Sequence, residues 1–182
     1  MILVVDMNGK QDSLGYYEFV MPILVIAQEL DECLVKHYSE VSSKDLADCN
    51  KIILSGTALK DNITLNDPEK FNWLKSVDKP VLGICAGMQT IGVVFGLLLT
   101  MCLEVGMTPM TTLSENPLFS ATFKAYSLHN YSVESSEDFE VLAESPRCLQ
   151  AIKHKQKPIY GVLFHPEVRN AEILKRFITL KQ

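Results

Sequence analysis

The segment that most constrains the fold is VLGICAGMQTIGVVFG, residues 81–96. A short apolar run leads into Cys85, and a helical pattern begins immediately after it. Gly83 and Gly87 stand two residues to either side. In a sharp strand-to-helix turn, side chains at these two positions would collide with the neighbouring strand or helix. The segment therefore predicts a nucleophile elbow in which cysteine takes the place of serine.

The chemistry expected of such an elbow suits a reactive thiol. A helix N-terminus behind Cys85 favours the thiolate, and the backbone N–H of Ala86 would point to the place where an oxyanion forms. The alternative is a buried structural cysteine at a glycine-rich join, because free cysteine is among the most buried residue types. The remaining cysteines lack this setting: Cys33, Cys49, Cys102 and Cys148.

The pattern around the elbow predicts an α/β fold. Apolar runs without a polar face alternate with helical segments, which is typical of an open, mostly parallel sheet flanked by helices. After residue 98 the runs become shorter and are joined by hairpin-like connections, so part of the sheet is expected to be antiparallel. We expect one domain over residues 1–182. The main predicted strands are 2–6, 33–38, 51–56, 80–85 and 158–164, and the main helices begin near 19, 43, 68, 86 and 170.

Composition excludes several classes of function. The net charge of −5 and the absence of any Lys or Arg run leave no electrostatic footprint for nucleic acid. No apolar run is long enough to span a bilayer, and the N-terminus lacks the features of a signal peptide. Five cysteines, an odd number without CxxC spacing, indicate a reducing cytoplasm and argue against both a disulfide framework and a zinc site. We expect neither metal nor cofactor.

A thiolate nucleophile needs a base, and the chain has four histidines. His37 lies in a predicted strand, His154 in a Lys-rich hairpin expected to be solvated, and His129 in YSLHNYS. His165, in GVLFHPEV, follows the last predicted strand. In open parallel sheets, sites gather at the carboxyl ends of strands, where Cys85 also lies. This placement favours His165.

The tripeptide His165-Pro166-Glu167 can supply both a base and the group that orients it. In extended backbone, residues two apart point to the same side, and Pro166 biases His165 away from helix. Glu167 could then accept a hydrogen bond from one ring nitrogen and leave the other to take a proton from Cys85. The alternative is a strand-end turn with a surface salt bridge.

Together, GICAGMQ, GVLFHPEV about eighty residues later, and KIILSG on the preceding strand resemble the class I (triad) glutamine amidotransferase family over essentially the whole chain. The resemblance implies a flavodoxin-like fold and thiol attack on the side-chain amide of glutamine. A thioester forms, ammonia leaves, and water releases glutamate. It also implies that Cys85 is the nucleophile, His165 the base and acid, and Glu167 the orienting group.

Further site residues follow from the same resemblance. Gln89, one helical turn after Cys85, would help to bind glutamine, although a lone glutamine is more often a surface helix residue. YSLHNYS resembles the family segment that holds the α-amino and α-carboxylate groups, which assigns Asn130 and Tyr131 to glutamine binding. Both could equally be ordinary strand residues.

One departure from the family pattern concerns the oxyanion hole. The family loop usually has the sequence Gly-Gly-Pro, whereas this chain has Ser55-Gly56-Thr57-Ala58. With Ala86, the N–H groups of Gly56 and Thr57 are the expected donors. A β-branched residue does not readily adopt φ > 0. If the loop needs that conformation, the hole is not preformed, and losing one donor costs about 10²–10³ in rate.

The amidotransferase type is indicated by two segments. EVGMTPMTTLSENPLF and the opening DMNGKQ resemble the amidotransferase subunits of GMP synthase, whereas HNYS is closer to the imidazole glycerol phosphate synthase type. Since no synthetase domain follows the closing helix, the resemblance implies a separate glutaminase that passes ammonia to a synthase subunit.

Two other classes of function stay open at this point. A stand-alone cysteine hydrolase of the α/β-hydrolase kind is disfavoured because there the acid precedes the histidine by many residues, whereas Glu167 follows His165. A non-catalytic regulatory relative, with its oxyanion hole disabled by the altered loop, is the other alternative.

Overall fold

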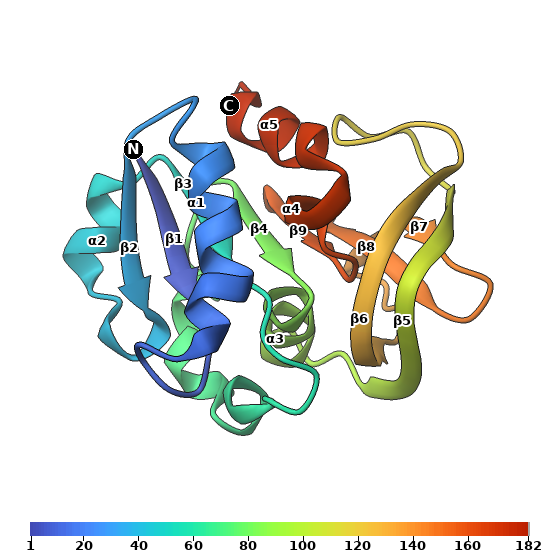
Figure 1. The fold of residues 1–182 in the computed structure, drawn as a ribbon, viewed down its shortest axis with the longest axis horizontal. Helices are drawn as coiled ribbons and strands as arrows, with labels where there is room; N and C mark the ends of the chain where they lie inside the picture. Colours follow the sequence, from blue (N-terminus) through green and yellow to red (C-terminus); the bar gives the residue numbers. More distant parts are fainter. Residues whose placement is uncertain (182) are drawn as a thin grey trace.

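The computed structural model describes residues 1–181. Within them the strands form a nine-stranded sheet in the order β2-β1-β3-β4-β9-β8-β7-β5-β6 (Figure 1). The strands are β1 (Ile2–Asp6), β2 (Cys33–His37), β3 (Lys51–Leu54), β4 (Val81–Ile84), β5 (Leu99–Thr112), β6 (Phe123–Val133), β7 (Phe139–Glu144), β8 (Leu149–His154) and β9 (Ile159–Val162).

The first half of this sheet is parallel, as the apolar runs predict. Strands β2, β1, β3, β4 and β9 pair in parallel with one another. Four of these strands, β1, β3, β4 and β9, are buried almost throughout. The predicted strands were slightly too long, since β3 ends at Leu54 and β9 at Val162.

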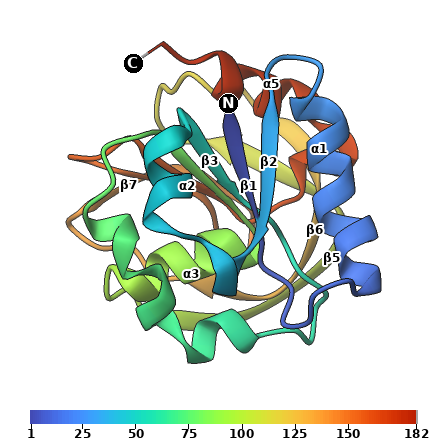
Figure 2. The same cartoon turned by 90° about the vertical axis from the view of Figure 1, so that its left-hand side faces the viewer.

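Helices cover both faces of the parallel strands. Figure 2 places α1 (Met21–Ala27) and α5 (Ala171–Thr179) on one side and α2 (Ser43–Asp48) and α3 (Ala86–Val94) on the other. The chain enters α1 through a π-helical turn, Tyr16–Val20. The helix predicted to start at Pro68 is a 3₁₀ helix, Pro68–Lys75, and follows another, Ile63–Asn66. A short helix after β9, α4 (Pro166–Arg169), was not predicted.

Two hydrophobic cores result from the alternation of side chains along the strands. Ile2 and Val4 of β1 point into the core beneath α1 and α5. Their neighbours Leu3 and Val5 point into the core beneath α3. Since both faces of β1 are fully buried, its sequence shows an unbroken apolar run and no polar face.

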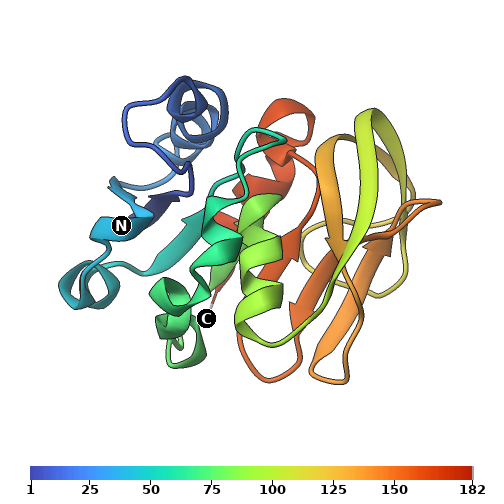
Figure 3. The ribbon, with the colours of Figure 1, turned by 90° about the horizontal axis from the view of Figure 1, so that it is seen from below.

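The second half of the sheet is antiparallel. Figure 3 shows the long β5–β6 hairpin at the opposite end of the molecule from the N-terminal strands. The sequence predicted short runs after residue 98, whereas the structure has the long continuous β5, which passes through Gly106 at φ +105. A register shift lies between Met101 and Glu104 of this strand. Among the described residues, no helix has the length and apolar character needed to cross a membrane.

Candidate active site

Cys85 sits in a strained turn between β4 and α3. Its backbone has φ 48 and ψ −102, a conformation that costs a non-glycine residue about 1–3 kcal/mol. The surrounding hydrogen bonds hold it there. Its N–H donates to the carbonyl oxygen of Val162 on β9 at 2.8 Å, and its own carbonyl accepts from the N–H of Gln89 at 3.0 Å. The thiol is thus fixed at the carboxyl end of a central strand.

The two flanking glycines permit this turn for the reason inferred from the sequence. A Cβ on Gly83 would lie 2.5 Å from the backbone carbon of Gly87 on α3. A Cβ on Gly87 would lie 2.7 Å from the carbonyl oxygen of Leu54 on β3. Both contacts are with backbone that cannot move aside. The strand, the helix and the neighbouring strand can therefore pack this closely only around glycine.

His165 lies opposite, just beyond β9. Its backbone N–H donates to the carbonyl oxygen of Tyr126 on β6 at 2.8 Å, and its ring nitrogen Nδ1 lies 2.7 Å from Oε1 of Glu167. Both side chains are almost fully buried. The contact arises differently from the extended segment that we predicted. His165 is the residue before α4, and Glu167 lies in the first turn of that helix.

The charge on His165 is controlled by its two neighbours. Burial of the ring, the largest single influence, lowers its pKa. The negative charges of the Glu167 carboxylate and of the Cys85 sulfur when it is ionised, together with hydrogen bonding to both, outweigh burial, so the pKa of His165 is raised well above its ordinary value. The thiol donates to the carbonyl oxygen of Leu128 at 3.4 Å. Nε2 of His165 has no hydrogen-bond partner among the described residues, and the raised pKa favours a proton on it, so it can hold the proton that Cys85 gives up.

The cavity at Cys85 is small, with a volume of about 10 Å³. That is room for roughly one water molecule and not for a glutamine side chain. One of its walls must therefore move before an amide can reach the thiol. The lining residues are Thr57, Ala58, Leu59, Asn62, Cys85, Gln89, Leu128, His129 and Asn130.

The three residues predicted for the oxyanion hole each have a different place relative to Cys85 and His165. Thr57 lines the cavity, and it is not among the described non-glycine residues with positive φ. The strain that we considered for its β-branched side chain is therefore absent. Gly56 packs against the imidazole, since a Cβ there would lie 2.6 Å from Cε1 of His165. Ala86 follows Cys85 directly as the first residue of α3, where helical N–H groups lack intrahelical partners.

The residues predicted to bind glutamine also lie around the thiol. Gln89 is buried, and its Nε2 donates to the carbonyl oxygen of Tyr131 at 2.8 Å. Asn130 lines the cavity. Tyr131 therefore takes part through its backbone carbonyl, whose hydrogen bond with Gln89 joins β6 to α3. Sequence reasoning missed Leu128, because a backbone carbonyl leaves no signal in residue identity.

Two of the remaining histidines, His37 and His154, make other contacts. Nε2 of His37 lies 2.7 Å from the carbonyl oxygen of Asn8. His154, which we expected to be solvated, is buried with its ring against Phe95 and Phe139. That prediction was wrong because the lysine-rich composition of the hairpin says nothing of the histidine side chain, which takes the inner face of β8.

A second group of cysteine, histidine and glutamate lies between β5, β6 and the turn that precedes β8. It contains Cys102, Glu104, His129 and Cys148, and their side-chain ligand atoms all lie within 4.8 Å of one another. Burial, together with the nearby thiol of Cys102, raises the pKa of Cys148 to about 12. Sequence reasoning missed this group. The available signal was the spacing of Cys102 and Glu104, which places both on one face of a strand.

Comparison with known proteins identifies the family. The chain matches the family model "Glutamine amidotransferase class-I" over residues 24–180. It is 34% identical to the A subunit of glutamine-hydrolyzing GMP synthase from Methanococcus maripaludis, over 97% of this chain and 95% of the relative. It is 42% identical to the protein of the same name from Methanocaldococcus jannaschii, although this alignment spans only 58% of that relative.

Solved structures share the fold. The crystal structure of a putative GMP synthase A-subunit protein from Thermoplasma acidophilum superposes with a TM-score of 0.84 at 25% identity, over 98% of this chain and 92% of the other. A glutamine amidotransferase from Thermotoga maritima gives a TM-score of 0.71 at 17% identity, over 98% and 80% of the two chains. The family model covers most of the chain, and the Methanococcus maripaludis relative aligns over nearly all of it. This chain therefore belongs to the class-I glutamine amidotransferase family.

Proposed function

We propose that this chain is the glutamine-hydrolysing subunit of a GMP synthase and that Cys85, His165 and Glu167 are its catalytic residues. The observation that carries the proposal is the strained thiol of Cys85 beside a histidine whose other ring nitrogen is 2.7 Å from a buried carboxylate. Relatives that bear the name of a GMP synthase support the pathway. We also place the chain in the cytoplasm, because its five cysteines are free.

The reaction follows from the roles of these groups. Nε2 of His165 takes the proton of Cys85, and the thiolate attacks the side-chain carbonyl carbon of glutamine. The N–H groups of Ala86 and of the Gly56–Thr57 loop stabilise the oxyanion. His165 then gives its proton to the departing ammonia, and a γ-glutamyl thioester remains. Water, deprotonated by the same imidazole, hydrolyses the thioester to glutamate and restores the thiol. Glu167 holds the imidazole in position and stabilises its charged form.

Of the two groups that combine cysteine, histidine and glutamate, only the one at Cys85 has the setting of a nucleophile among the residues that the structure describes. Cys85 lies at the start of α3, where helix N–H groups face the site. Cys102 lies within strand β5 and not at a helix N-terminus, and its carbonyl oxygen lies 2.9 Å from Nδ1 of His129. A strand interior offers no preformed oxyanion donors, so we assign nucleophilic attack to Cys85.

The small size of this cavity predicts that the isolated chain hydrolyses glutamine slowly. The segment of residues 57–62 supplies four of its lining residues and is a loop outside the helices and strands. We propose that docking of the synthase subunit moves this segment and admits glutamine. Such gating would couple ammonia release to the presence of an acceptor.

An exposed apolar row on β5 is a suitable surface for that partner. Met101, Leu103, Val105 and Met107 alternate along the strand and are 50–80% exposed. Val105 pairs with Leu128, so both side chains project from the same face of the hairpin, and Leu128 lines the cavity at Cys85. A partner seated on this row would lie next to the glutamine site. Exposed apolar patches of this kind mark interaction surfaces.

Replacing the nucleophile tests the assignment of the reaction. We expect Cys85→Ala to lower glutamate production from glutamine by about 10⁴-fold or more, measured with the synthase subunit present. Cys33→Ser is the matched control, because Cys33 is a half-buried thiol on β2 far along the sheet from the site, and it should retain full activity. Residual activity of Cys85→Ala near that of the control would refute the role of Cys85.

The proton affinity of His165 tests the role of Glu167. We expect NMR titration to place the pKa of His165 well above the ordinary value of about 6.5. Glu167→Gln removes a negative neighbour that favours the charged ring, so the pKa should fall. The control is Glu172→Gln, which removes an exposed carboxylate on α5 and should leave the titration unchanged. An unaltered pKa in Glu167→Gln would contradict the proposed ion pair.

A charge placed on the apolar row tests partner docking. We expect Val105→Glu to weaken binding of the synthase subunit by about 10-fold or more, because losing a contact worth about 1.4 kcal/mol lowers affinity tenfold. At a fixed, limiting concentration of the synthase subunit, its stimulation of glutaminase activity should fall accordingly. Activity without the partner should not change. Val25→Glu on α1 is the matched control, since Val25 is 58% exposed and Val105 61%. Equal stimulation of the two variants would exclude this surface.

A further inference from the structure

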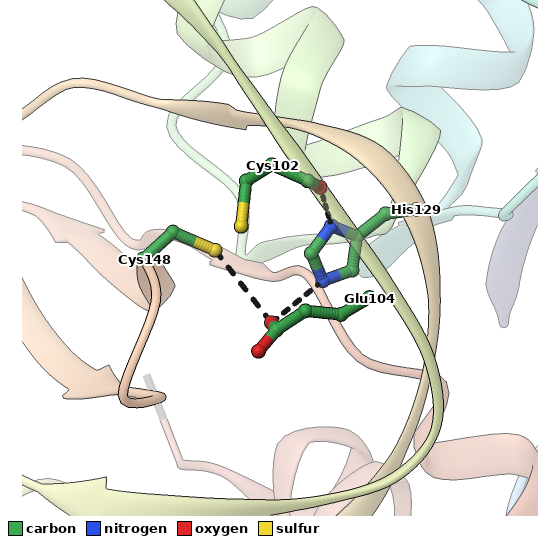
Figure 4. Close-up of side chains that lie close together, drawn as sticks. All are labelled: Cys102, Glu104, His129 and Cys148. Carbon is green, nitrogen blue, oxygen red and sulfur yellow. Dashed lines mark hydrogen bonds and ion pairs between the residues drawn. The ribbon is translucent and has the colours of Figure 1, made fainter.

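The second group, between β5, β6 and the turn that precedes β8, has the composition of a metal centre (Figure 4). Cys102 and Glu104 come from β5, His129 from β6, and Cys148 from the turn that precedes β8. Two thiols, one imidazole and one carboxylate converge, with their ligand atoms within 4.8 Å of one another. Thiolate and imidazole ligands favour Zn²⁺ among the common divalent ions. We propose that these four residues bind one zinc ion.

The spacing of the ligand atoms fits tetrahedral coordination. Zinc bonds of about 2.0–2.3 Å at tetrahedral angles place neighbouring ligand atoms about 3.4–3.8 Å apart. Nε2 of His129 is 3.3 Å from Oε2 of Glu104, and Sγ of Cys148 is 3.7 Å from the same oxygen. Both distances from Glu104 are therefore close to those of a tetrahedral site. The remaining ligand atoms lie within 4.8 Å of one another, so side-chain movements of about 1 Å would complete the sphere.

The outer contacts also prepare His129 to bind a metal. Its Nδ1 lies 2.9 Å from the carbonyl oxygen of Cys102. Because a carbonyl oxygen can only accept, Nδ1 carries the proton and Nε2 presents its lone pair to the cluster. Metal-binding histidines are commonly held by such a bond from the second ring nitrogen to a carbonyl. Glu104 is oriented in turn by the hydroxyl of Ser145, which donates to its Oε2 at 3.1 Å.

The competing explanation is a hydrogen-bonded network centred on Gln150. Its Nε2 donates to Oε2 of Glu104 at 2.7 Å and lies 3.3 Å from Nε2 of His129. This network does not satisfy the amide itself, because Oε1 of the fully buried Gln150 has no hydrogen-bond partner among the described residues. A buried polar atom without a partner is unfavourable. Nε2 of this amide faces the cluster. A bound cation would favour the opposite orientation of the amide, in which Oε1 faces the cation.

An ion can reach the site from solvent. A pocket of about 560 Å³ opens beside it and is lined by Ser132, Ser145, Arg147 and Cys148, among others. Cys148 is only half-buried, so it stands between this pocket and the buried ligands. Once bound, the ion would join β5, β6 and the β7–β8 turn through direct bonds to side chains of all three.

Zinc titration of the full reduced chain tests the proposal. The Cys85→Ala background removes the catalytic thiol as a second place for zinc to bind. We expect one zinc per chain by elemental analysis, a rise in Tm on zinc addition, and thiolate-to-metal absorption when Co²⁺ replaces zinc. Cys102→Ser and Cys148→Ser should each weaken zinc binding by at least about 100-fold, since changes to outer contacts alone cost about 10–100-fold. Cys33→Ser, in the same background, should bind as before.

Several results would overturn the zinc site. These are a chain that binds no stoichiometric zinc, zinc affinity that is the same in Cys148→Ser and Cys33→Ser, or a zinc-dependent rise in Tm that persists when both cluster cysteines are replaced. A disulfide between Cys102 and Cys148 that persists in reducing buffer and prevents zinc binding would also overturn it. The Tm readout keeps the test valid even if one variant is less stable, because it compares each protein with and without zinc.

Discussion

The strained turn at Cys85 is the constraint on which the rest of the site depends. A cysteine at φ 48 persists only where its surroundings hold it, and here β9, α3 and β3 all do so within hydrogen-bond or contact distance. Gly83 and Gly87 allow these elements to approach. The same close packing brings the end of β9, and with it His165, to the thiol. Fold and chemistry thus share one requirement: a sharp turn from a central strand into a helix.

Strand β6 connects the two clusters of reactive groups. Its Leu128 carbonyl accepts from the thiol of Cys85, and its Tyr131 carbonyl accepts from Gln89. His129, between them, points to the other side and contacts Glu104. A change in the position of this strand would therefore alter both the wall of the glutamine site and the proposed zinc ligands. Binding at one face of β6 can in this way stabilise the geometry at the other.

Local features were predictable from the sequence, and features made by distant segments were not. The elbow was predicted because one short segment contains its strand, glycines and helix. The contact of His165 with Glu167 was predicted, but from an extended backbone that proved to be a helix start. The cluster at His129 was missed because strand pairing assembles it from three segments, which CxxC spacing cannot reveal. The small size of the cavity depends on how residues 57–62 pack, and composition says nothing of this.

The most direct test of the central claim is the site of covalent labelling by a glutamine analogue such as diazo-oxo-norleucine. The chain would be labelled together with the proposed synthase subunit, so that the small size of the cavity does not prevent access, and then digested for peptide mapping by mass spectrometry. The account predicts one adduct per chain, on Cys85, and protection by excess glutamine. An adduct on Cys102 or Cys148, or no adduct under conditions in which the complex turns over glutamine, would contradict it.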